Sequence, residues 1–401
     1  EELAAARVGH TRIGHGQNAF AREFQIIKEF ITTATDYLFI TTKDMEAKGT
    51  RLWIEKACGV QGKTIEVNQF SFDDIRTKLA SFDFDVYEKT IVNLTGGTKV
   101  MTIVANDFFK SLGADIYYVT GSNSEYVKVF PLKKDKTRCF LHETTLSEYL
   151  TAYGFEYTQP TLSGISFEQS EKIFNNYTKT NFSDYLNEFS VLRAKRGRRI
   201  DETEFSNVEK FLEAIGYTPK RDGELDKVET KYLTGEWFEE YIGLRIKKEL
   251  NLADENILIG TVLTKNASIP QNSVEKLLGI CDDSQVGNRN ELDIVFMYGN
   301  KFYSIECKSS IIDYRDKKEV NILGETIYKS DSLKSRFGLF AKTSIVTLSD
   351  FKTYCQDKDK GQQNNKTREM LSLIERADLS RIKLIDKSLL VGSSSLFELI
   401  K

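Results

Sequence analysis

The segment Glu291–Lys308 constrains the fold of this chain most strongly, because its pattern predicts a β-hairpin with a defined register. Two runs rich in aromatic and branched residues flank Gly299-Asn300, a dipeptide typical of two-residue hairpin turns. A two-residue turn fixes which residues pair across the two strands. Counting back from the turn places Asp293 directly opposite Glu306, with their Cβ atoms roughly 5 Å apart.

One face of this hairpin is expected to be charged and the other to be buried. Period-two alternation puts Lys308 on the same face as Glu306. Like charges that face each other across a sheet destabilise it, so this pair needs positive charge between its members. A divalent cation held by oxygen ligands meets that need, with Lys308 beside it to stabilise developing negative charge or to orient a water. A surface hairpin with solvated charges is the alternative. The opposite face carries residues typical of a core: Leu292, Ile294, Phe296, Tyr303, Ile305 and Cys307.

An aspartate followed on the paired strand by Glu-x-Lys resembles the motif of the restriction-endonuclease-like, or PD-(D/E)xK, nucleases. The resemblance implies a metal-dependent phosphodiester hydrolase, with Asp293, Glu306 and Lys308 as catalytic residues. It also implies Mn²⁺ or Mg²⁺ bound by Asp293, Glu306 and Cys307. In restriction-type folds a helix before the core hairpin often supplies a further metal-site acid, and the helix expected over 235–250 contains Trp-Phe-Glu239, so the resemblance implies Glu239 as a further metal ligand. Its alternative role is a surface acid that complements the helix dipole.

The first third of the chain alternates strands with helices. Strands are expected over 36–42, 64–70, 90–93 and 115–120, with amphipathic helices between them. This alternation is typical of a mainly parallel, doubly wound sheet. Such sheets bind ligands beyond the carboxyl ends of their strands.

The loop Asn93-Leu-Thr-Gly-Gly-Thr-Lys99 joins one of these strands to the next helix. Its glycines allow backbone N–H groups to approach an anion, and a helix N-terminus favours negative charge. The spacing is neither that of a P-loop nor that of the dinucleotide fingerprint. The loop therefore predicts an anion or nucleotide site, with a tight polar turn as the alternative.

Asn-x-Thr-Gly-Gly-Thr-Lys after a strand resembles the signature of CARF domains, the Rossmann-like sensors of CRISPR-associated proteins. The resemblance implies a homodimer that binds a cyclic oligoadenylate at its two-fold axis. Gly121-Ser122 is a weaker candidate contact. The implied effector contacts are Asn93, Thr95, Gly96, Gly97, Thr98 and Lys99, with Gln17, Asn18, Thr41 and Thr42 from neighbouring loops.

Composition excludes several other classes of protein. The net charge of −3 gives no global basic signature, so any nucleic-acid contact must be local. Five scattered cysteines without a C-x-x-C pair, together with three histidines, argue against a disulfide framework and a zinc site. We find no run of membrane-spanning length and no secretory signal, so a cytoplasmic protein without membrane contact is expected.

The whole pattern predicts an α/β protein with a Rossmann-like CARF domain (1–135), a helical connector (136–228) and a restriction-endonuclease-like domain (229–401). The connector contains a basic run, 193–199, that is either a solvated loop or a phosphate contact. A helix expected over 326–336 offers Lys329, Lys334 and Arg336 as nucleic-acid contacts.

This combination resembles the CRISPR ancillary nucleases of type III antiviral defence. It implies activation by cyclic tetra-adenylate and cleavage of single-stranded DNA or RNA, with possible nicking of duplex DNA. The alternatives are a non-catalytic cyclic-nucleotide-sensing regulator and an ungated nuclease of the DNA-repair or restriction type.

Overall fold

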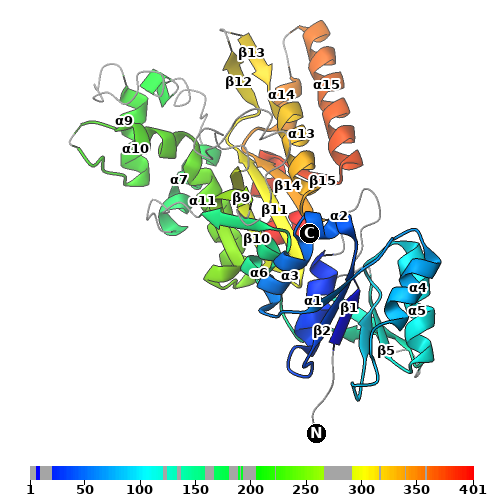
Figure 1. Cartoon of the computed structure of the whole chain (residues 1–401). Coiled ribbons are helices and arrows are strands. Elements are labelled where there is room, and N and C mark those ends of the chain that lie inside the picture. Colours follow the sequence, from blue (N-terminus) through cyan, green and yellow to red (C-terminus); the bar gives the residue numbers. More distant parts are fainter. Residues whose placement is uncertain are drawn as a thin grey trace, which may run out of the picture.

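The computed structural model describes residues 6–9, 20–120, 124–132, 137–158, 167–179, 188–189, 191–192, 205–221, 223–265, 291–315, 318–338, 340–356 and 359–401 (Figure 1). Four of the predicted contacts, Gln17, Asn18, Gly121 and Ser122, lie outside these residues, as does the basic run 193–199.

The first sheet has seven strands in the order β3-β2-β1-β4-β5-β6-β7. The first five of these are parallel, as predicted, and the last two are antiparallel. The order reverses between β1 and β4, which is where doubly wound sheets bind ligands. The strands are β1 (Ala6–Gly9), β2 (Tyr37–Thr41), β3 (Lys63–Glu66), β4 (Ile91–Asn93), β5 (Asp115–Val119), β6 (Glu125–Phe130) and β7 (Arg138–Cys139).

Helices cover both faces of the first sheet. Helices α4 (Phe72–Ala80) and α5 (Lys99–Ser111) pack on one face, while α1 (Phe20–Phe30) and α3 (Thr50–Cys58) pack on the other. Helix α2 (Lys43–Ala47) follows β2, and α6 (Leu146–Ala152) packs against α3. The sheet is therefore a three-layer unit, as the alternation of strands and helices predicts.

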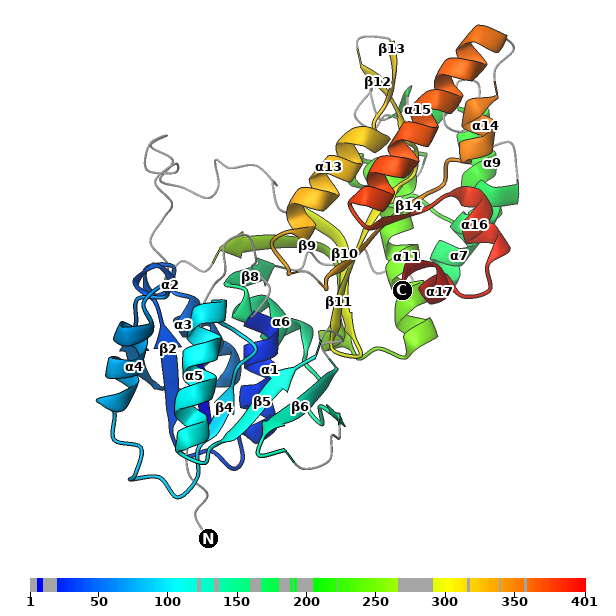
Figure 2. The same cartoon turned by 90° about the vertical axis from the view of Figure 1, so that its right-hand side faces the viewer.

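The second sheet has six strands in the order β15-β14-β11-β10-β9-β8, with the predicted hairpin at its centre (Figure 2). Strands β14 and β15 run parallel to β11, whereas the other neighbours are antiparallel. The strands are β8 (Phe155–Thr158), β9 (Ile257–Lys265), β10 (Glu291–Tyr298), β11 (Lys301–Lys308), β14 (Lys342–Thr347) and β15 (Ile382–Ile385). A separate short hairpin is formed by β12 (Ile312–Arg315) and β13 (Lys318–Asn321).

One face of the second sheet packs against α11 (Trp237–Leu250), with the fully buried Trp237 at its start. On the other face, α13 (Leu323–Lys334) and α15 (Lys360–Leu379) cover β14 and β15. The remaining elements are α7 (Phe167–Lys179), α9 (Ser206–Ile215), α10 (Lys227–Lys231), a π-helical turn (Tyr232–Glu236), a 3-10 turn (Asp254–Asn256), α14 (Phe351–Cys355), α16 (Lys387–Gly392) and α17 (Leu396–Ile400).

The two sheets share a hydrophobic cluster, which we call the shared core. It joins side chains of α1, α3 and α6 to side chains of β9, β10 and β11 in the second sheet. The connector also contributes a strand to each sheet, because β7 belongs to the first sheet and β8 to the second. We keep the domain boundaries 1–135, 136–228 and 229–401 as a proposal. Members of the shared core include Phe24, Ile27, Ile54, Tyr149, Leu258, Val295, Met297, Phe302 and Phe337.

Gly154, which leads into β8, supports a first prediction. It has φ 79°, and a Cβ atom added there would lie 2.5 Å from the Trp53 ring. We expect Gly154→Ala to lower the free energy of unfolding by about 2–4 kcal/mol, through left-handed strain and overpacking together. Gly216 is the matched control, because it has φ 66° and open space around it. Gly216→Ala should cost only about 1 kcal/mol of strain, measured by urea denaturation. Equal losses at the two positions would contradict the close contact with Trp53.

Candidate active site and strand-end loop

The hairpin forms with the predicted register. Its pairs run from Ile294 with Ile305 to Tyr298 with Lys301. Both turn residues have positive φ, 55° for Gly299 and 59° for Asn300. These are the values of a type I′ turn, whose twist matches that of the strands. Local turn chemistry therefore fixes the register on which the prediction of the acid pair depends.

Five of the six residues predicted for the apolar face lie together beneath α11. The Phe296 and Tyr303 rings stack there, with centroids 4.7 Å apart. The five are Ile294, Phe296, Tyr303, Ile305 and Cys307. Leu292 was assigned to this face wrongly, because it packs in the shared core instead. The regular geometry is interrupted next to it: β9 contains Gly260, with φ 62°, between the residues that pair with Leu292 and Ile294.

The two acids are buried, with Asp293 6% exposed and Glu306 5% exposed. Backbone pairing between β10 and β11 ends at Ile294 and Ile305. Beyond this pair, a side chain takes the place of a backbone acceptor: Asp293 Oδ2 accepts a 2.7 Å hydrogen bond from the Cys307 N–H. This bond fixes the carboxylate beside the end of β11.

Two lysines neutralise these acids. Lys308 Nζ lies 2.7 Å from Glu306 Oε1 and 4.0 Å from Asp293 Oδ2. Lys329, which α13 contributes from the neighbouring layer, places its Nζ 3.0 Å from the same Glu306 oxygen. We call Asp293, Glu306, Lys308 and Lys329 the acid–lysine cluster. Lys329 was predicted as a nucleic-acid contact, and the structure shows that it contacts a predicted catalytic acid directly.

The electrostatics of the cluster follow from burial. Burial, and then the nearby charge of Glu306, raise the pKa of Asp293 to about 7. Burial, and then the charge of Asp293, raise the pKa of Glu239 on α11 to about 9. For Lys308, burial alone lowers the pKa, but the Asp293 and Glu306 charges outweigh it and raise the pKa overall. Three acids, Asp293, Glu306 and Glu239, thus lie near only two lysines, and the remaining negative charge favours a bound cation or a proton.

The donor set fits a hard divalent cation that keeps several water ligands. Within the described part of the chain, no group of three or more His, Cys, Asp and Glu side chains is placed to hold a metal ion. Mg²⁺, however, is commonly bound through one or two carboxylates plus water and substrate phosphate, and Asp293 and Glu306 supply two. The Cys307 side chain packs in the apolar cluster under α11, and burial raises the pKa of its thiol, so the neutral thiol is a poor ligand for a hard cation. Glu239 is partly buried and close enough to Asp293 for their charges to interact.

Glu239 gives a pH-dependent prediction for stability. Its folded pKa is raised above that of the unfolded chain, so its contribution to stability declines as pH rises from about 4.5 towards 9. In chelator-treated protein, we expect Glu239→Gln to raise the unfolding temperature at pH 8 and to leave it nearly unchanged at pH 4.5. Glu249→Gln, on the last turn of α11, should show no such pH-dependent gain. Thermal unfolding at the two pH values measures this, and a gain at pH 4.5 alone would contradict the shift.

The other two predicted nucleic-acid contacts lie near the end of α13. Lys334 Nζ donates to the carbonyls of Ser380 and Arg381, at 2.8 and 3.0 Å, just beyond α15. Burial lowers its pKa, which fits this inward position. Arg336 follows the last residue of α13 by two positions. Lys334 therefore joins two helices of the outer layer.

The predicted strand-end loop, Asn93–Lys99, lies between β4 and α5. Asn93 is buried, and its Oδ1 accepts hydrogen bonds from Thr95 N and Thr95 Oγ1 at 3.0 and 2.5 Å. Thr95 Oγ1 in turn accepts from Val119 N at 2.8 Å, which ties the loop to β5. Gly97 has φ 103°, a conformation that favours glycine.

The start of α5 completes this loop. Thr98 is its N-cap and accepts a 3.2 Å hydrogen bond from Met101 N. Thr102 Oγ1 donates to the Gly96 carbonyl at 3.3 Å. Lys99, the first helical residue, is exposed. An exposed cation at the N-terminus of a helix, at the ligand-binding edge of the sheet, suits an anionic ligand.

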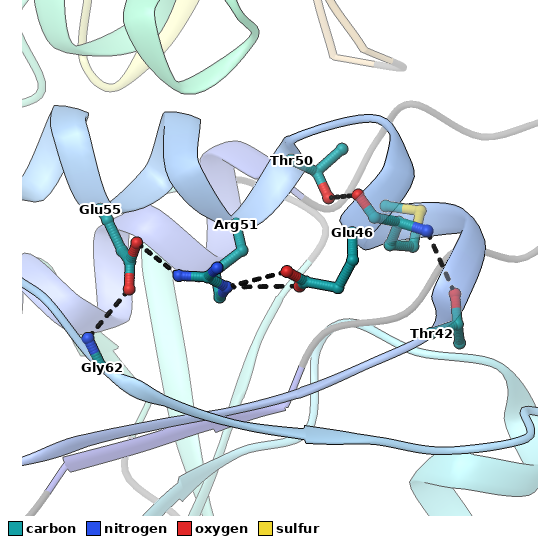
Figure 3. Close-up of polar contacts among 7 residues, drawn as sticks. Thr42, Glu46, Thr50, Arg51, Glu55 and Gly62 are labelled. Atoms are coloured by element: carbon teal, nitrogen blue, oxygen red, sulfur yellow. Dashed lines mark hydrogen bonds and ion pairs between the residues drawn. The ribbon is translucent and has the colours of Figure 1, made fainter. Parts of the chain in front are cut away.

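Thr41 is the last residue of β2, at the same edge of the sheet, and Thr42 follows it; both are buried. Thr42 is the N-cap of α2, accepting a 3.4 Å hydrogen bond from Met45 N (Figure 3). Arg51 then bridges Glu46 and Glu55, at 3.1 and 2.7 Å, and Glu55 accepts from Gly62 N (Figure 3). This network holds the two helices that follow β2 in place.

Comparison with known proteins gives matches for both halves. Residues 22–149 match the family described as the Card1 CARF domain, and residues 226–385 match the family described as the Card1-like endonuclease domain. Together these matches span well over half of the chain. Among curated proteins, none matches the sequence at a significant level.

No described helix is both long and apolar enough to cross a membrane.

Two solved structures share the fold over nearly the whole chain. The protein VC1899 from Vibrio cholerae aligns with a TM-score of 0.67 at 16% identity, covering 97% of this chain and 96% of its own. Can2 from Sulfobacillus thermosulfidooxidans, in complex with cyclic tetra-adenylate, also aligns with a TM-score of 0.67, at 18% identity and 99% coverage of both chains. The α/β fold of both halves is therefore confirmed.

Proposed function

The chain belongs to the CARF-domain CRISPR nucleases with a Card1-like endonuclease domain, and on that premise we propose that cyclic tetra-adenylate activates it to cut single-stranded DNA, RNA or both. One observation carries this proposal: a buried acid–lysine cluster and an anion-suited strand-end loop occur in one chain and are linked by a shared core. The complex of Can2 with cyclic tetra-adenylate supports this choice of activator.

Asp293 and Glu306 are the residues that would hold Mg²⁺ or Mn²⁺, with the Cys307 carbonyl and Glu239 as further ligands. When bound, such an ion lowers the pKa of a bound water and neutralises the phosphate. Lys308 is held by both acids, so its ammonium is oriented before substrate arrives and can stabilise charge that develops on the phosphate. Lys329 places a second positive charge on Glu306 and, being 40% exposed, can contact the substrate backbone.

In the strand-end loop, Asn93 and Thr95 hold the backbone in shape for the activator, while Lys99 supplies positive charge to its phosphates. Thr98 and the two glycines keep the N–H groups of the helix N-terminus accessible. Thr41 and Thr42 would contact the ligand from the end of β2. We propose that the activator binds across the two-fold axis of a homodimer and favours the cutting arrangement of the nuclease domains through its differential affinity.

Cleavage assays test this function. Single-stranded DNA, single-stranded RNA and duplex DNA would each be incubated with Mg²⁺, Mn²⁺ or a chelator, with and without cyclic oligoadenylates of different ring size. We expect cutting only with a divalent metal and with cyclic tetra-adenylate. Binding of the activator without any cutting would identify a non-catalytic regulator, and equal cutting without it would identify an ungated nuclease.

A further inference from the structure

The turn of the catalytic hairpin is held by the CARF half of the chain, residues 22–149, although the acids lie at the other end of the hairpin. Asn300 Oδ1 accepts a 2.7 Å hydrogen bond from Thr144 N. Asn300 Nδ2 donates to the His142 carbonyl at 3.2 Å. Ser124 Oγ donates to the Gly299 carbonyl at 3.0 Å. We call these contacts the turn clamp.

Asn300 meets two structural demands at once. Its φ of 59° suits the second position of a type I′ turn, where asparagine and glycine are both common. Its side-chain amide is also buried, at 8% exposure, and uses both its oxygen and its nitrogen on the CARF half. Since glycine would serve the turn equally well, the turn alone does not explain the side chain.

The segment 142–144, which hydrogen-bonds to Asn300, is itself bound to α1. Glu29 accepts a 3.0 Å hydrogen bond from Leu141 N, next to His142. Lys28 forms a 2.9 Å ion pair with Glu148, which also contacts the His142 ring at 3.0 Å. Helix α1 packs against β1, the strand that pairs with β4 beside Asn93. A continuous set of contacts therefore joins the strand-end loop to the hairpin turn.

A second contact supports the first along the same hairpin. The Tyr149 ring of α6 stacks on Phe302 of β11, with centroids 5.1 Å apart and planes 7° apart. Its hydroxyl donates to the Phe337 carbonyl at 2.5 Å, just beyond α13. The CARF half thus holds both the hairpin and the segment that follows the Lys329 helix.

We propose that Asn300 is a positioning residue that couples the CARF half to the catalytic hairpin, so that a change at the activator site moves Asp293 and Glu306 with the turn. From Tyr298, next to the turn, to Asp293 the strand β10 advances five residues, or about 17 Å, and its backbone is paired with β11 as far as Ile294. A paired hairpin held at its turn transmits a displacement along its length more directly than a flexible linker does. This inference rests on the proposed activation by cyclic tetra-adenylate.

The test is Asn300→Gly in the full-length chain, because glycine keeps the type I′ turn and removes the amide. We expect the activation ratio, meaning the cleavage rate with cyclic tetra-adenylate divided by the rate without it, to fall by about tenfold or more. Ser124→Ala removes the third clamp bond without touching the turn, and it should lower the ratio in the same direction by less. Ser304→Ala is the matched control, because its 2.9 Å bond to Thr343 lies within the second sheet. It should leave the ratio unchanged.

Hydrogen exchange separates coupling from folding. In the wild type, we expect the activator to change exchange at the β10 and β11 amides. In Asn300→Gly that response should be lost, while the unfolding midpoint and the affinity of the full-length chain for cyclic tetra-adenylate stay close to wild type. Equal activation ratios and equal exchange responses in wild type and variant would overturn this inference and leave the proposed function standing. A wild type that neither binds the activator nor cuts would overturn the proposed function, and this inference with it.

Discussion

Asp293→Asn is expected to abolish cleavage while leaving the fold intact. The amide oxygen of asparagine can still accept the hydrogen bond from Cys307 N, so the end of the hairpin should keep its shape. The substitution removes one of the two buried negative charges that would bind the catalytic cation. Such charge stabilisation is worth several kcal/mol, so we expect the cleavage rate to fall by about 10³-fold or more.

Asp115→Asn is the matched control for this variant. Asp115 also contacts two lysines, Lys89 at 3.0 Å and Lys128 at 2.6 Å, but it lies at the start of β5 in the first sheet. Its variant should cut at close to the wild-type rate. Cleavage under saturating activator measures both, with circular dichroism as a check on folding. Wild-type activity in Asp293→Asn would show that the acid pair is structural.

Lys99→Ala is expected to weaken activation without impairing chemistry. Lys99 is exposed and starts α5, so its removal should not disturb the packing of the loop. A charge-assisted hydrogen bond to a phosphate is worth about 1.5–3 kcal/mol, so the activator concentration for half-maximal cleavage should rise about tenfold to a hundredfold. At saturating activator, the cleavage rate of Lys99→Ala should equal that of the wild type.

The control for this variant is Lys110→Ala, which removes an exposed lysine from the last turn of the same helix. It should leave the half-maximal concentration unchanged. Activator titrations of the cleavage rate measure both variants. An equal rise in the two would indicate a general effect of helix charge, and no rise in Lys99→Ala would remove Lys99 from the activator site.

The features that the sequence predicted best are those set by local chemistry. The Gly299-Asn300 dipeptide predicted a two-residue turn, and the register counted from that turn is the one observed in the hairpin. The alternation of strands and helices likewise predicted the parallel order of the first sheet. Thr98 caps α5 where the loop sequence placed a helix N-terminus. Each of these depends on residues a few positions apart.

The features that the sequence did not predict depend on contacts between distant segments. Nothing near Lys329 indicates that its ammonium reaches Glu306, because α13 must first pack against the second sheet. The inward position of Lys334 depends in the same way on where α15 ends. Alternation assigns Leu292 to the face under α11, yet Leu292 packs in the shared core, beside the stretch of β9 where Gly260 has a positive φ. The turn clamp on Asn300 joins residues more than 150 positions apart, so no local pattern marks it.

The proposed cleavage requires a divalent cation between the two acids at the end of the hairpin. Crystals grown with Mn²⁺ and measured at the manganese absorption edge would locate this ion. We expect one anomalous peak within bonding distance of both Asp293 and Glu306, and no peak there in Asp293→Asn crystals. A peak at another site, with Lys308 and Lys329 still neutralising the two acids in the Mn²⁺ crystals, would contradict this expectation.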